Sequence, residues 1–190
     1  MPLTSQYYGG RTAAPGRTMQ DFGLCDLKGN HVYTNKTRQK GLMVVTFFAP
    51  LSAPSQRLLQ TLQTWTETVP TDKWTAVGVT DGDRETLAKF AQERGLTGLT
   101  LLLDYELYQT RAWGITNLPT TFLIAGRTGM ILDKVVGDDL AALSQLQTLL
   151  TGEVAKIVAA EAAAKKADEE KKAAEAAAKA AAKAAAAPAK

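Results

Sequence analysis

Residues 42–55 read LMVVTFFAPLSAPS, an apolar run that passes directly into the start of a helix. The apolar part, residues 42–48, is typical of a strand that is buried on both faces of a sheet. Ser52 is suited to cap the helix, and Pro54 lies in the first turn, where a missing N–H costs nothing. These residues therefore predict a central strand followed by a helix.

Strands and helices alternate on both sides of this stretch. A hairpin is expected from residues 21–25 and 31–34, with its turn at residues 28–30. Apolar runs predict further strands at 74–79, 99–103, 118–124 and 130–136, and helical spacing predicts helices at 52–69, 84–94, 105–113 and 138–150. Alternation of this kind predicts an α/β sandwich built around one sheet.

The composition changes sharply after Gly152, where Ala, Lys and Glu take over and aromatic residues end. These residue types favour helix, so we expect a helix to about Ala187 that is stopped by Pro188. Such a helix has little but alanine to bury and is typical of a semi-rigid spacer, either solvated or held against a partner. The predicted organisation is an N-terminal arm (1–20), one domain (21–151) and a helical tail (152–190).

Bulk properties exclude several classes of function. The net charge of +3 is small and mixed, which does not favour nucleic-acid binding. No run of eighteen apolar residues is present, so no transmembrane segment is expected. Residues 1–20 lack the apolar stretch of a signal peptide and are expected to form a flexible arm. A cytoplasmic or organellar location is favoured, and a periplasmic one stays open if a signal peptide precedes the numbering.

Few residues are available for metal or thiol chemistry. Cys25 is the only cysteine and His31 the only histidine. A single cysteine cannot form an intramolecular disulfide, and one histidine gives a zinc site or a catalytic triad almost nothing to build from. We therefore expect no metal and no cofactor, and we expect Cys25 to fill space in the hairpin as a small, partly buried side chain.

Three segments resemble the thioredoxin superfamily, in particular its TlpA/ResA-like and peroxiredoxin-like (AhpC/TSA-related) branch. They are DFGLCDLKGN at 21–30, VVTFFAPLSAPS at 44–55 and GITNLPTTFLI at 114–124. The resemblance covers about residues 20–151 and implies a thioredoxin-like three-layer sandwich with a central mixed sheet. It also implies that Pro119 is cis and faces the loop at Ser52, forming with Leu51, Pro54 and Leu118 a groove for an extended protein segment.

The chain departs from the family where the redox chemistry resides. Ser52 and Ser55 occupy the positions of the two exchanging cysteines, and a serine hydroxyl neither ionises near neutral pH nor exchanges with disulfides. Leu51 replaces the tryptophan before the first cysteine, and the acid that thioredoxins bury six residues before it falls on Thr46. Counted from Pro50, the peroxiredoxin motif also lacks its cysteine.

Two functions remain. The favoured one is a redox-inactive thioredoxin-like protein, without enzyme activity, that serves as a structural or accessory subunit of a larger assembly. Its protein partner would bind the groove or the alanine-rich helix. The alternative is a TlpA/ResA-like thiol-disulfide oxidoreductase whose two cysteines were changed to serine. The altered neighbours Leu51 and Thr46 favour natural loss, because an engineer replacing cysteines would leave such positions alone.

Overall fold

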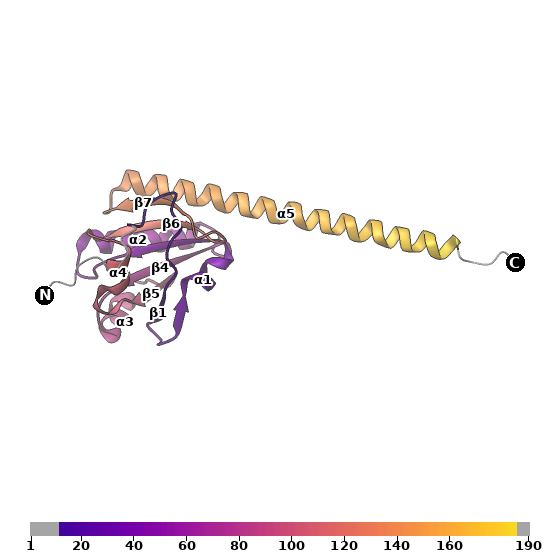
Figure 1. The fold of residues 1–190 in the computed structure, drawn as a ribbon. Helices are drawn as coiled ribbons and strands as arrows, with labels where there is room; N and C mark the ends of the chain where they lie inside the picture. The colour runs from indigo at the N-terminus through magenta and orange to yellow at the C-terminus, as the bar shows by residue number, and fades with distance from the viewer. Residues whose placement is uncertain (1–11, 186–190) are drawn as a thin grey trace. The chain divides into compact units, whose positions relative to one another are not determined.

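The computed structural model of the protein describes residues 12–185, leaving out the side chains of Lys40 and of residues 176–185. The helices α1–α5 and most of the strands are labelled in Figure 1. In chain order the elements are β1 (Gly23–Asp26), β2 (His31–Tyr33), α1 (Thr34–Thr37), the 3-10 turn η1 (Arg38–Lys40), β3 (Leu42–Phe47), α2 (Ala53–Thr68), β4 (Trp74–Thr80), α3 (Arg84–Glu93), β5 (Leu99–Leu103), the 3-10 turn η2 (Tyr105–Leu107), α4 (Tyr108–Ala112), β6 (Thr120–Ala125), β7 (Ile131–Val136) and α5 (Leu140–Ala185).

A single seven-stranded sheet forms the middle of the fold, in the order β2-β1-β5-β4-β3-β6-β7. The central strands β3, β4 and β5 are parallel to one another, and the remaining pairings are antiparallel. All six residues of β3 are buried, as expected for a strand covered on both faces. The predicted mixed sheet and the predicted N-terminal hairpin are confirmed.

Alternation along β3 directs its side chains into two separate layers. Met43, Val45 and Phe47 belong to a core cluster that includes Trp113, which follows α4. Phe48 points to the other face, where it stacks on Phe90 of α3 with ring centroids 6.5 Å apart. Buried leucines of α2 and of the first turns of α5 complete the fold as a three-layer α/β sandwich: Leu58, Leu59, Leu62, Leu143, Leu146 and Leu150.

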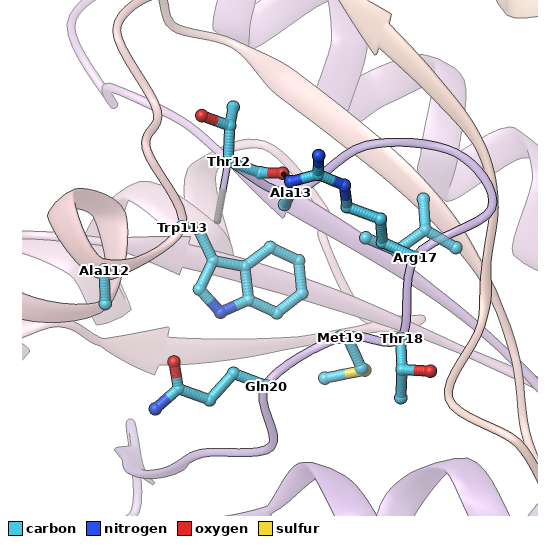
Figure 2. A pocket seen from close by; sticks show the side chains of 9 residues that line it. Thr12, Ala13, Arg17, Thr18, Met19, Gln20, Ala112 and Trp113 are labelled. Atoms are coloured by element: carbon cyan, nitrogen blue, oxygen red, sulfur yellow. Dashed lines mark hydrogen bonds between the residues drawn. The ribbon is translucent and has the colours of Figure 1, made fainter. Parts of the chain in front are cut away.

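The described part of the N-terminal segment, residues 12–20, is not the flexible arm that the sequence predicted. Ala13 and Met19 are buried in the core cluster. The amide of Gly16 donates to the carbonyl of Ile131, whose own amide donates to Arg17, and Thr18 forms an isolated bridge with Met130. Residues 12–20 therefore pack on the core cluster that includes Trp113, where several of them line the pocket shown in Figure 2, and pair with the start of β7. Residues 1–11 lie outside the described residues.

Helix α5 contains two segments that the sequence predicted to be helical. The sequence predicted a closing helix at 138–150 and a helical tail from 152, and the structure joins the two in one helix of 46 residues that runs through Gly152. The chain forms two compact units, and the first of them ends at Val154. Val154 is buried, as is Leu150 one turn earlier. Packing on both sides of Gly152 outweighs the cost of a helical glycine, about 1 kcal/mol. None of the helices among residues 12–185 is long and apolar enough to cross a bilayer.

Candidate functional site

The sheet brings two predicted site segments to one end. Because β3 and β6 are antiparallel and pair Phe47 with Thr120, the residues after β3 and those before β6 lie at the same edge. The Leu118–Pro119 peptide bond is cis, as the sequence predicted. Pro119 is buried, and its carbonyl accepts a hydrogen bond from the amide of Gly137 at 2.8 Å. The cis-proline segment is thus tied to the strand beside it.

The turn that opens α2 is held by side chains as well as by backbone. Ser52 donates its amide to the carbonyl of Ala49 at 3.0 Å. Gln56 donates its side-chain amide to the carbonyl of Pro50 at 2.8 Å, and its oxygen accepts from Arg94 at 2.7 Å. Residues 49–52 are therefore fastened to both α2 and α3, which preorganises the loop at the mouth of the helix.

The two serines are neutral and have different surroundings. Ser52 occupies the N-cap position of α2 in an extended conformation, but its hydroxyl makes no capping hydrogen bond, contrary to expectation. Ser55 is completely buried, and its Oγ accepts a hydrogen bond from the amide of Ala49 at 3.2 Å. Neither residue provides a soft, ionisable nucleophile at the helix N-terminus, where a cysteine would be activated.

A second neutral pair lies in the buried sheet nearby. Thr46 and Thr121 face each other across β3 and β6, with their hydroxyl oxygens 2.9 Å apart, and both are fully buried. One hydroxyl donates to the other, and neither threonine has a titratable side chain. Proton transfer by a buried acid at Thr46 is excluded.

Exposed apolar side chains occur in the segments that begin or end near this end of the sheet. Leu51 is 96% exposed in the turn before α2, and Leu118 is 37% exposed before the cis-proline. Val136, which is paired with Thr120, and Leu140 at the start of α5 are 49% and 77% exposed. We call Leu51, Leu118, Val136 and Leu140 the apolar rim. The groove predicted from Leu51, Ser52, Pro54, Leu118 and Pro119 stays a prediction; three cavities of the described structure are lined by other residues.

Asp104 is a fully buried acid that no motif of the sequence had indicated as important. It follows β5, and its carboxylate accepts hydrogen bonds from the amide of Gln109 at 2.8 Å and from the amide and hydroxyl of Thr110 at 2.8 and 2.7 Å. Asp104 therefore organises the start of α4. The feature of the sequence that could have identified Asp104 is its position directly after an apolar strand.

Cys25 lies away from the serines, in the N-terminal hairpin. It is half-buried, and its Sγ is 3.9 Å from each ring nitrogen of His31 on the paired strand. The partly buried position that the sequence predicted is confirmed. The part of the chain that the structure describes holds no group of three or more residues able to ligate a metal.

The sheet order, the helix that follows β3 and the cis-proline beside it define a thioredoxin-like fold. The model of the AhpC/TSA family matches residues 15–132. The chain therefore belongs to the AhpC/TSA family, as the resemblance of its segments implied. A comparison with curated protein sequences gives no significant match.

Solved structures agree with this fold. Peroxidoxin BcpB from Mycobacterium tuberculosis is 21% identical with a TM-score of 0.63, covering 72% of this chain and 95% of its own. A thiol-disulfide oxidoreductase from Bacteroides fragilis is 20% identical with a TM-score of 0.59, covering 70% and 99%. A secreted Mycobacterium tuberculosis disulfide oxidoreductase is 21% identical with a TM-score of 0.56, covering 71% and 95%. The match to the family model ends at residue 132, before α5 begins.

Proposed function

We propose that this protein is a redox-inactive member of its family that acts by binding, as a structural or accessory subunit of a larger assembly. The observation that carries the proposal is the pair Ser52 and Ser55 in a site whose backbone framework is retained. The ordered turn, the helix N-terminus and the cis Pro119 are all present. The two thiol groups of a redox-active cysteine pair are absent at positions 52 and 55.

Thiol-disulfide exchange needs a thiolate that attacks one sulfur and a second thiol that resolves the mixed disulfide. At Ser52 the attacking atom would be a neutral hydroxyl. At Ser55 the Oγ is buried and hydrogen-bonded to the amide of Ala49. Cys25 is the only cysteine of the chain, so no dithiol can form within it. The scaffold would retain binding and lose electron transfer.

The apolar rim supports a protein partner at this end of the sheet. Exposed apolar side chains that form a contiguous patch mark surfaces that other proteins cover, and we propose that the rim forms such a patch. An extended segment could pair with backbone beside Pro119 while its side chains contact Leu51 and Leu118. The alanine-rich part of α5 offers a second surface, because small side chains let another backbone approach closely.

The alternative function is thiol-disulfide exchange by a natural form with cysteines at positions 52 and 55. The intact turn and cis-proline favour it. The first test is the sequence of the encoding gene, because cysteine codons at both positions would establish the alternative. If the serines are native, the unmodified protein should give no dithiol turnover in an insulin-reduction assay, and turnover would overturn the proposal.

The binding role is tested by purifying the tagged protein from its own cells and identifying what co-purifies. Leu51→Asp in the rim should remove a partner, because it places a charge in the apolar contact. Met130→Asp is the matched control, since Met130 is also exposed but lies at the opposite end of β6. A variant ending at Val154 tests the tail separately. A partner set unchanged in both Leu51→Asp and the shortened chain would refute the proposal.

A further inference from the structure

The connection between β4 and α3 contains the only Asp-Gly pair of the sequence, Asp81 and Gly82. Both residues are exposed, and neither belongs to a strand or a helix. The residues on either side are held in place: Thr80 is buried at the end of β4, and Asp83 caps α3 by accepting from the amide of Thr86 at 2.9 Å. The pair is thus an exposed link between two ordered elements.

The side chain of Asp81 already meets the backbone of the next residue. The amide nitrogen of Gly82 donates to Oδ1 of Asp81 at 2.9 Å, so the nitrogen lies against the carboxyl group. Gly82 has a φ of +144°, which favours glycine, and a Cβ placed on it would meet nothing within 4 Å. Neither a side chain of its own nor a neighbouring segment crowds Gly82 on this side.

We propose that the Asp81–Gly82 link is a site of spontaneous modification, at which Asp81 is converted into an isoaspartyl residue. The nitrogen of Gly82 loses its proton and attacks Cγ of Asp81, which forms a C–N bond while a carboxyl oxygen leaves as water. The product is a cyclic imide, a succinimide. Water then adds to one of the ring carbonyls: opening at Cγ restores aspartate, and opening at the former main-chain carbonyl gives isoaspartate. The water lost on closure is regained on opening, and no oxidant or reductant takes part.

The isoaspartyl product differs from Asp81 in two ways. Its main chain runs through the former side chain, which adds one methylene between Thr80 and the cap residue Asp83. Its α-carboxylate is free and stands on an exposed link. That carboxylate is the group that isoaspartyl-specific carboxyl methyltransferases esterify with S-adenosylmethionine, so the modified chain is a substrate for this class of enzyme. The reaction involves neither the serines nor the apolar rim and is independent of the proposed function.

Asp133 gives a matched comparison within the same chain. The amide of Lys134 donates to Oδ1 of Asp133 at 2.7 Å, so the same contact is present. Both residues, however, lie in β7 and pair with β6, and the residue that follows the acid carries a side chain. Strand pairing and crowding hinder the movement that ring closure needs, so Asp133 should stay unchanged.

The complete chain is incubated for several weeks at neutral pH, well below its unfolding temperature, beside a synthetic peptide of residues 77–87. Methyl transfer by an isoaspartyl-specific methyltransferase measures isoaspartate. Electron-transfer fragmentation locates it, because its mass equals that of aspartate. We expect isoaspartate at residue 81 at a rate within about tenfold of that in the peptide, since local opening of an exposed loop costs almost no free energy.

Two variants test the assignment. Asp81→Glu keeps the charge but would have to close a larger ring, and it should abolish methyl transfer to the chain. Asp133→Glu makes the same change in β7 and should leave methyl transfer as in the wild type.

Three results would overturn the proposal. A rate at residue 81 more than about tenfold below that of the peptide would show that the fold protects the link. Equal conversion at residue 133 would show that the exposed link has no special reactivity. Methyl transfer that persists in Asp81→Glu would place the modified residue elsewhere.

Discussion

Replacing Asp104 tests how strongly one buried carboxylate stabilises the domain. Its two oxygens accept three hydrogen bonds, from the amides of Gln109 and Thr110 and from the Thr110 hydroxyl. The side chain is fully buried, so water cannot readily take over as acceptor. Asp104→Ala would leave two amides and one hydroxyl facing an apolar hole.

The magnitude follows from these three bonds. Each buried donor left unpaired costs about 1–3 kcal/mol, and losing an ordinary helix cap costs about 0.5–2 kcal/mol. Relief of the cost of burying a charge offsets part of this sum. We expect Asp104→Ala to lower the free energy of unfolding by about 3–4 kcal/mol, a large share of the 5–15 kcal/mol typical of a domain. Asp104→Asn keeps one acceptor oxygen and should lose about 2 kcal/mol.

Urea unfolding followed by far-ultraviolet circular dichroism measures this loss, with an unchanged slope as the sign of an unchanged transition. Asp83→Ala is the control, because Asp83 caps α3 by accepting from the amide of Thr86 but is exposed. Its loss should be clearly smaller. Equal losses for the two variants would refute the claim that burial gives Asp104 its importance.

Two further predictions concern polar pairs elsewhere. Hydrogen bonds from Arg38 hold the pKa of Asp21 below its ordinary value of 3.8. The Asp21–Arg38 pair therefore stabilises the folded state fully at pH values above the ordinary pKa of 3.8. This stabilisation is lost as the pH falls through the lower pKa that Asp21 has in the folded state. Wild type should lose stability below about pH 4 more steeply than Asp21→Asn in urea unfolding; parallel curves would contradict this. Thr46→Val should cost about 1 kcal/mol by leaving the Thr121 hydroxyl unpaired, and adding Thr121→Val should recover most of it. Additive losses in the double-mutant cycle would count against direct pairing of the hydroxyls.

Local patterns in the sequence were sufficient for most of the fold. The apolar run of β3, the hairpin turn at residues 28–30 and the motif around Pro119 each carry their structural signal within a few residues. The expected strands, and the helices expected at 52–69 and 84–94, agree with the observed elements to within a few residues at their ends, whereas α1 and η1 were not predicted.

Features that depend on distant partners could not be predicted. Residues 12–20 look polar and rich in turn formers, and only contact with β7 and Trp113 orders them. Gly152 indicates a helix boundary by local propensity, yet packing of Leu150 and Val154 overrides it. The Trp113 nitrogen, which has no hydrogen-bond partner among the described residues, is also invisible in sequence, because pairing depends on which acceptors the fold brings near it.

The pairing of residues 16–18 with the start of β7 has a consequence for solubility. Strand β7 is the last in the sheet order, and such a strand exposes backbone groups that can recruit strands from other molecules. Gly16, Arg17 and Thr18 occupy those groups at Ile131 and Met130. Proteolytic removal of this segment would therefore uncover a template for intermolecular sheet growth, and with it an apolar surface that promotes aggregation.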